Sequence, residues 1–99
     1  MSFRVRYTRG ARDDLKRLFT FLAERDAAAA KRARRAISKS MDLLTEFPWS
    51  CRKAANDNPF LRELVISFGG GGYVALFEID DAQTITILAI RHQREADFT

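Results

Sequence analysis

The chain has 99 residues, of which 46% are hydrophobic and 30% are charged, and its formal net charge is +4. This length suits a single domain over residues 1–99 with one small core, and the composition excludes a disordered or fibrous chain. No apolar run reaches the roughly 18 residues that a membrane span needs, and the first residues lack the apolar region of a signal peptide, so we expect a cytoplasmic protein. The lone cysteine, Cys51, cannot form an internal disulfide and is expected to be partly buried in a loop.

The first quarter of the chain predicts a strand followed by a helix. Apolar Phe3, Val5 and Tyr7 alternate with arginines, which is the pattern of a strand over residues 2–7 with one buried face. Thr8 is a candidate N-cap for the helix that follows. Apolar residues then recur at helical steps over residues 9–24 and form one stripe: Ala11, Leu15, Leu18, Phe19 and Leu22.

A second helix is expected over residues 27–47, because Asp26 can cap its start and Pro48 cannot continue it. With so short a connection, the two helices should form an antiparallel hairpin. Basic residues occupy the positions away from its apolar stripe: Lys31, Arg32, Arg34, Arg35 and Lys39. We favour a solvated outer face over a surface for an acidic partner or nucleic acid, and sequence-specific nucleic-acid recognition is not expected.

After a loop expected over residues 49–59, three runs rich in Val, Ile, Phe and Thr predict a meander of strands. The runs are separated by GGGG at 69–72 and by DDAQ at 80–83, which are typical of two hairpins. Trp49 is expected to plug the core beneath the loop. The predicted architecture is therefore α+β, in the order strand, two helices, three strands, with the helix hairpin on one face of a mainly antiparallel sheet.

Both faces of this predicted sheet are substantially apolar. Strict alternation places one set of residues on the first face: Leu64, Ile66, Phe68, Tyr73, Ala75, Phe77, Ile79, Ile85, Ile87 and Ala89. The second face receives another set: Leu61, Val65, Val74, Leu76, Leu88 and Ile90. Because the helix hairpin can cover only one face, the other requires a partner, unless a long loop or the C-terminal tail folds over it.

The third run ends in Arg91, His92, Gln93 and Arg94. A histidine between arginines suits phosphodiester chemistry, because it can act as a general acid beside fixed positive charges. A polar cap at the end of a strand also explains a single histidine, and this is the interpretation we favour from the residues alone.

The segments LRELVI, GYVALFEI and ILAIRHQRE, together with the predicted order of elements, resemble the ParE branch of the RelE/ParE superfamily of bacterial type II toxins. The resemblance covers essentially the whole chain. It implies a small toxin that a co-expressed antitoxin wraps and holds inactive by covering its apolar grooves. ParE-type toxins inhibit DNA gyrase, whereas RelE-type toxins cut messenger RNA on the ribosome.

Two departures from the RelE pattern favour the gyrase-directed branch. RelE-type members commonly carry an arginine three residues before the aromatic of the central strand, where this chain has Val74 before Phe77. The C-terminal tyrosine of several members is also absent. A fraction of a ribonuclease site remains: Arg62, Arg91, His92 and Arg94.

We therefore expect a non-enzymatic gyrase inhibitor that needs no metal or cofactor. The alternatives are a ribosome-dependent ribonuclease and a harmless module that only binds the antitoxin. Toxicity is expected to depend on Arg91, His92 and Arg94. The antitoxin is expected to contact apolar residues of the helices and the sheet: Leu15, Phe19, Leu64, Tyr73 and Phe77.

Overall fold

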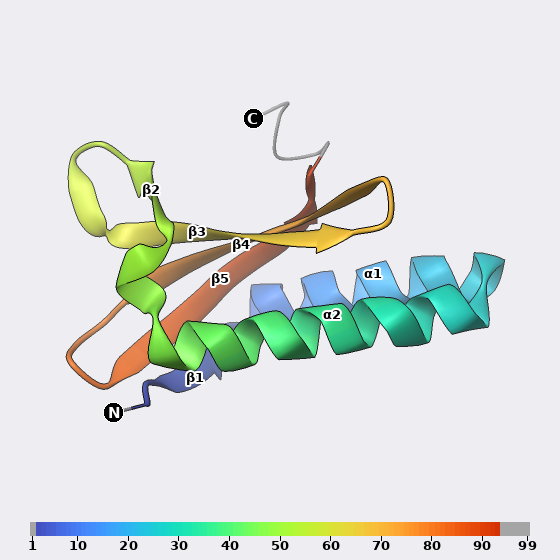
Figure 1. Cartoon of the computed structure of the whole chain (residues 1–99), viewed down its shortest axis with the longest axis horizontal. Coiled ribbons are helices and arrows are strands. Elements are labelled where there is room, and N and C mark those ends of the chain that lie inside the picture. Colours follow the sequence, from blue (N-terminus) through green and yellow to red (C-terminus); the bar gives the residue numbers. More distant parts are fainter. Residues whose placement is uncertain (1, 94–99) are drawn as a thin grey trace.

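The computed structural model describes residues 2–93 and shows two long helices packed on one face of a sheet (Figure 1). The elements follow in the order β1 (Arg4–Tyr7), α1 (Arg9–Arg25), α2 (Ala27–Glu46), the 3-10 helix η1 (Pro48–Ser50), β2 (Arg52–Ala55), β3 (Asn58–Phe68), β4 (Gly71–Ile79) and β5 (Thr84–His92). The predicted α+β architecture is confirmed. No helix within residues 2–93 is long and apolar enough to cross a membrane.

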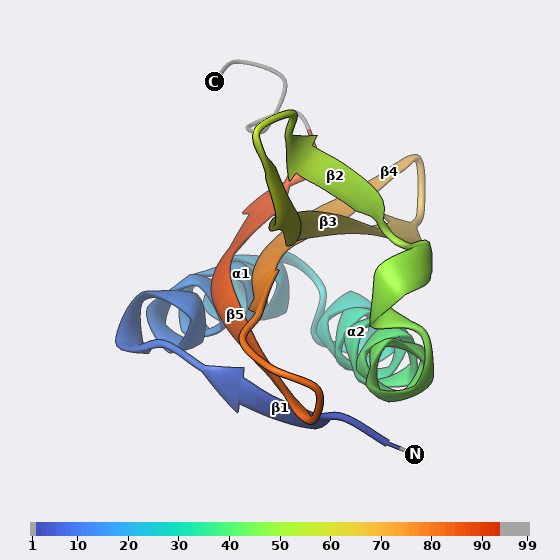
Figure 2. The same ribbon diagram turned by 90° about the vertical axis from the view of Figure 1, so that its left-hand side faces the viewer.

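The sheet has five strands in the order β1-β5-β4-β3-β2. β1 runs parallel to β5, and every other neighbouring pair is antiparallel (Figure 2). The parallel pair is possible because the helix hairpin and the meander form a long crossover between its strands. The first and last strands of the fold therefore lie side by side, next to α1.

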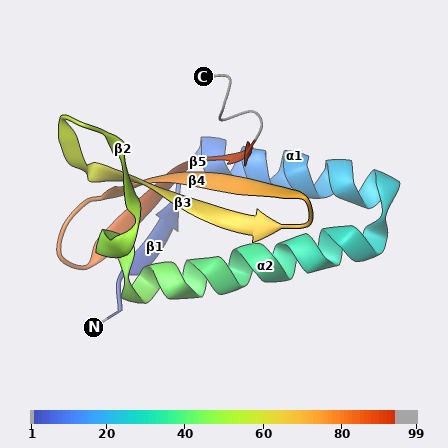
Figure 3. The ribbon, with the colours of Figure 1, turned by 45° about the horizontal axis from the view of Figure 1, so that its top comes forward.

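Both helices begin where the sequence predicts. The hydroxyl of Thr8 accepts a hydrogen bond from the N–H of Ala11 at 3.0 Å, and the Asp26 carboxylate accepts from Ala28 and Ala29 at 3.0 and 3.2 Å. Figure 3 shows α1 and α2 running antiparallel along the sheet. The core lies between them and the sheet: Ala11, Leu18, Ala33, Ile37, Met41, Leu44, Ile66, Tyr73, Ala75, Phe77, Ile79, Ile85, Ile87 and Ile90.

The segment expected to be a loop contains regular structure. The chain turns through η1 and then forms β2, which pairs with the first part of β3 as far as Glu63. The prediction that Trp49 plugs the core is wrong, because its side chain is 49% exposed and Pro48 is the buried residue of η1. Trp49 packs instead edge-on against Phe60, with 5.8 Å between ring centroids. Cys51 is half-buried, as expected.

A β-bulge in β5 changes the faces predicted for its last residues. Leu88 is an extra residue between Ile87 and Ala89, both of which pair with β4. The bulge reverses the alternation, so Ile90 lies in the core with 0% exposure and Ala89 faces away from the helices. The predicted faces of Ala89 and Ile90 are therefore wrong. Strict alternation would have buried Arg91, and a buried unpaired charge costs more than a locally disrupted ladder.

On the face of the sheet away from the helices, neighbouring apolar side chains differ in exposure. Val74 lies on this face and is 5% exposed, whereas its neighbour Val65 on β3 is 40% exposed. The C-terminal tail, which could fold over this face, begins at residue 94 and lies outside the described residues. Val65 consequently remains as exposed apolar surface at the edge of the described sheet.

Candidate functional site

His92, the last residue of β5, lies in a pocket of about 580 Å³ at one end of the sheet. Its partner on β4 is Tyr73, and the two rings meet edge-on with centroids 5.9 Å apart. The pocket is completed by α1 and the β3–β4 hairpin: Arg17, Leu18, Phe21, Leu22, Phe68, Gly69, Gly70 and Gly71. Among the described residues that line it, only Arg17 has a fixed positive charge, so the pocket suits an apolar group better than a phosphate.

Arg62 lies far from His92 and is occupied by main-chain contacts. Its guanidinium donates to three carbonyl oxygens: Pro59 at 2.7 Å, Cys51 at 2.8 Å and Trp49 at 3.1 Å. Arg62 pairs with Phe77 of β4, whereas His92 pairs with Tyr73, so the two positions are about 13 Å apart along the strand. The structure therefore does not bring Arg62 and His92 together, as a shared ribonuclease site would require.

Arg91 and His92 face opposite sides of the sheet, because neighbouring residues of a strand alternate. Arg91 is exposed and pairs with Val74, on the face away from the helices. Arg94 lies outside the described residues. The structure thus describes two of the three residues expected to determine toxicity, Arg91 and His92. Their side chains lie on different surfaces at the same end of β5.

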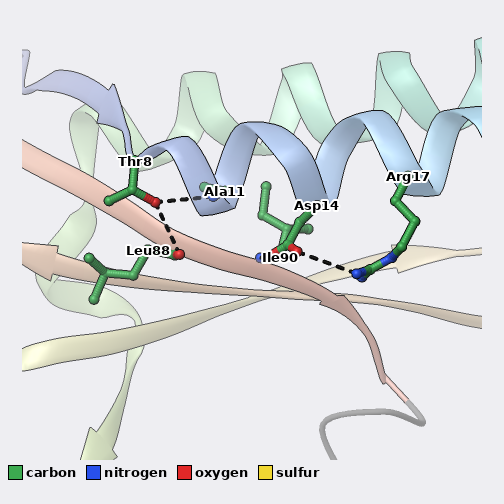
Figure 4. Close-up of polar contacts among 6 residues, drawn as sticks. All are labelled: Thr8, Ala11, Asp14, Arg17, Leu88 and Ile90. Atoms are coloured by element: carbon green, nitrogen blue, oxygen red, sulfur yellow. Dashed lines mark hydrogen bonds and ion pairs between the residues drawn. The ribbon is translucent and has the colours of Figure 1, made fainter.

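The first turns of α1 are tied to the bulge of β5 (Figure 4). The Thr8 hydroxyl donates to the carbonyl oxygen of Leu88 at 3.2 Å, and Oδ2 of Asp14 accepts from the N–H of Ile90 at 2.9 Å. Oδ1 of Asp14 also lies 3.5 Å from the guanidinium of Arg17. One carboxylate therefore contacts both the main chain before Arg91 and a side chain of the His92 pocket.

The residues expected to contact an antitoxin differ in accessibility. Leu15 and Phe19 are half-buried and line a groove of about 510 Å³ between the helices and β1, so part of their surface is available. Leu64 is also half-buried. Phe77 is 0% exposed and Tyr73 is 3% exposed. The prediction fails for Phe77, which lies beneath the helices, and Tyr73 lines the His92 pocket with little of its surface accessible.

Sequence reasoning missed an apolar groove of about 400 Å³ between the end of α2 and β3. Its most exposed lining residues are Phe47 at 62% and Leu43 at 57%, together with Val65 at 40%, which borders the groove from the far face of the sheet at the β3 edge. Beside the groove, residues 64–68 of β3 pair only with β4, because the described pairing of β2 ends at Glu63. An edge of unpaired main chain next to apolar surface is what an extended peptide needs to add a strand.

Two titratable groups near these surfaces have raised pKa values. Burial raises the pKa of the Tyr73 hydroxyl. Burial also raises the pKa of the Cys51 thiol, and the neighbouring positive charge of Arg62 opposes this effect. Both groups therefore stay protonated at neutral pH, which argues against either as a nucleophile. Within residues 2–93, no three side chains of the metal-binding types gather into a site.

A match to a protein family, a curated relative and a solved structure together relate this chain to known proteins. The family described as "ParE toxin of type II toxin-antitoxin system, parDE" matches residues 5–97. A curated relative, Toxin RelE1 of Caulobacter vibrioides, is 35% identical over 79 residues, which make up 80% of this chain and 82% of that protein. A chain of the chromosomal ParDE toxin-antitoxin system from P. aeruginosa has the same fold, with a TM-score of 0.69 at 18% identity over 92% of this chain and 96% of that one. The resemblance of the motifs is confirmed, and the chain belongs to the ParE family of toxins of type II toxin-antitoxin systems.

Proposed function

We propose that this chain inhibits DNA gyrase by binding to it, without chemistry of its own, and that a cognate antitoxin holds it inactive. Membership of the ParE family supports gyrase as the target. The relative named RelE1 is the reason to test a ribosome-dependent ribonuclease as the alternative. Either target is found in the cytoplasm, so the proposal places the action of the chain there.

The observation that supports a non-enzymatic toxin best is the separation of the residues that a ribonuclease would need. Stabilising the transition state of phosphodiester cleavage requires several positive charges around the phosphorus. His92 lies in a mainly apolar pocket, Arg62 bonds to carbonyl oxygens elsewhere, and Arg91 faces the other side of the sheet. Arg17 remains beside His92, but Asp14 lies 3.5 Å from it and offsets its charge.

Two assays in parallel test this proposal. The purified chain should inhibit supercoiling by gyrase and should leave messenger RNA on ribosomes intact. RNA cleavage that disappears in His92→Ala would overturn the proposal in favour of the ribonuclease. A chain that is inactive in both assays and harmless when expressed without antitoxin would identify it as a binding module alone.

For neutralisation, we propose that the antitoxin adds a strand to the edge of β3 over residues 64–68. Every second residue of an edge strand directs its N–H and C=O outward, where a second chain can pair with them. The apolar groove beside this edge can take alternate side chains of such a strand. Exposed basic residues continue along α2 from Leu43 at helical steps: Lys39, Arg35 and Arg32. The partner segment should therefore be extended, apolar toward the groove and acidic toward α2.

Charge substitutions in the groove test this docking surface. Leu43→Lys and Val65→Lys should abolish neutralisation by co-expressed antitoxin while leaving growth arrest in its absence unchanged. Phe60→Lys is the matched control, because Phe60 is 50% exposed but lies outside the groove, and it should remain neutralised. Equal neutralisation of all three variants would contradict docking at the β3 edge.

A further inference from the structure

We propose that Asp14 is a positioning residue for toxicity, which holds the end of β5 so that Arg91 and His92 meet the target in a fixed orientation. The inference rests on the proposed function, since it concerns the same end of β5. Asp14 itself is not proposed to touch the target. Its role follows from the hydrogen bond that its carboxylate accepts from the N–H of Ile90, one residue before Arg91.

The bulge creates the need for this contact. β1 pairs with β5 only as far as Tyr7 opposite Ile87, so the residues of β5 beyond Ile87 have no strand on that side within the described chain. Ile90 is 0% exposed. Its N–H donates to Oδ2 of Asp14 at 2.9 Å, and the Asp14 side chain is itself only 20% exposed. Without this acceptor, a main-chain donor in a buried setting would lose its partner.

Thr8 provides the other half of the attachment. Its N–H donates to the carbonyl oxygen of Ile87 at 3.0 Å, and its hydroxyl donates to that of Leu88 at 3.2 Å. The start of α1 thus replaces the missing strand at three main-chain groups of β5, and Figure 4 shows two of the residues concerned, Leu88 and Ile90. Asp14 makes the last of these contacts along β5, so it acts most directly on the two residues that follow Ile90.

The Asp14 contact affects the position of the end of β5 more than it affects the register in which β5 folds. The burial of Ile90 in the core selects the shifted register, because the alternative would bury Arg91. Loss of the Asp14 contact therefore leaves the register in place. Among the described strands, the last two residues of β5 then pair only with β4, through Val74 and Tyr73. Fraying of this end should reduce toxicity more than it reduces the stability of the fold.

The test compares two neighbouring aspartates. Asp14→Ala removes the acceptor, and Asp13→Ala removes the same charge from an adjacent exposed position for which no hydrogen bond to β5 is described. Asp14→Asn keeps an oxygen acceptor and should behave as wild type. In Asp14→Ala, amide hydrogen exchange at Ile90 should accelerate by about tenfold or more. Growth arrest without antitoxin should then require roughly tenfold more protein. Antitoxin affinity should stay close to that of Asp13→Ala, and the melting temperature should fall by only a few degrees.

Two outcomes would overturn the inference. Unchanged amide exchange at Ile90 in Asp14→Ala would show that the carboxylate does not hold the strand end. Faster exchange with toxicity equal to that of Asp13→Ala would show that the contact is structural only. If Asp14→Ala does not fold, Asp14→Glu keeps the charge, displaces the acceptor by one methylene and carries the same expectations. Growth arrest and amide exchange are independent of the target, so a failure of wild type to inhibit gyrase would refute the proposed function without deciding the role of Asp14.

Discussion

The guanidinium of Arg62 donates to the carbonyl oxygen of Cys51 at 2.8 Å and so ties the middle of β3 to the chain that enters β2. Further hydrogen bonds reach the carbonyl oxygens of Trp49 and Pro59, and the guanidinium lies 5.1 Å from the centre of the Trp49 ring. A residue that the sequence offers as part of a phosphate site is thus used to hold the β2–β3 hairpin in place.

Arg62→Ala should therefore destabilise the fold without any specific effect on a target. Loss of its charge-assisted hydrogen bonds should lower the free energy of unfolding by about 1.5–3 kcal/mol, measured by urea denaturation. Arg52→Ala is the control, because Arg52 forms a surface ion pair with Glu63 at 3.0 Å and is 58% exposed, so about 1 kcal/mol or less is expected. Equal losses in the two variants would contradict the structural role of Arg62.

In the β3–β4 hairpin, replacement of Gly72 by alanine should cost much more stability than replacement of Gly70. A Cβ at Gly72 would collide with the carbonyl oxygen of Ile66 on the paired strand, whereas a Cβ at Gly70 would meet nothing within 4 Å. Gly72→Ala should lower the free energy of unfolding by about 1–3 kcal/mol, because the two strands must separate locally. Gly70→Ala should be close to neutral. Thermal denaturation of both variants measures the difference, and equal melting temperatures would contradict the packing described for this hairpin.

The buried hydroxyl of Tyr73 predicts a loss of stability in alkaline solution. Burial raises its folded-state pKa above the ordinary value of 10.0. Its contribution to stability is therefore fully present below that pH, and it is lost as the pH rises through the folded-state pKa, because the unfolded chain releases the proton first. Tyr73→Phe should reduce the alkaline loss in urea denaturation series from about pH 8 to 11. An identical pH dependence in wild type and Tyr73→Phe would contradict the burial of this hydroxyl.

The elements with strong local signals could be predicted from the sequence. The caps Thr8 and Asp26 and the helical stripes determine α1 and α2, and the glycine and aspartate turns separate β3, β4 and β5. The motifs of the last three strands, together with the predicted order of elements, were sufficient for the family. These signals lie within single elements, so they do not depend on which parts of the chain pack together.

The candidate site could not be predicted in the same way, because it depends on contacts between distant elements. The bulge at Leu88 places Ile90 in the core, where its N–H donates to the carboxylate of Asp14, which is 76 residues away along the chain. Periodicity within one strand cannot reveal such a shift, so the sequence could not show which of Arg91 and His92 lies on the helix side of the sheet. β2 has only 4 residues and pairs irregularly with β3, so its sequence, RKAA, lacks the alternating apolar pattern of a strand and suggested a loop.

The most direct test of the central claim is supercoiling by purified DNA gyrase in the presence of wild type, Arg91→Ala and Arg52→Ala. Both arginines are exposed on the described chain, but only Arg91 lies at the end of β5. Wild type and Arg52→Ala should inhibit gyrase equally, and Arg91→Ala should be weaker by about tenfold or more, as expected for a central binding residue. The absence of inhibition by wild type, together with ribosome-dependent RNA cleavage that is lost in His92→Ala, would contradict the account.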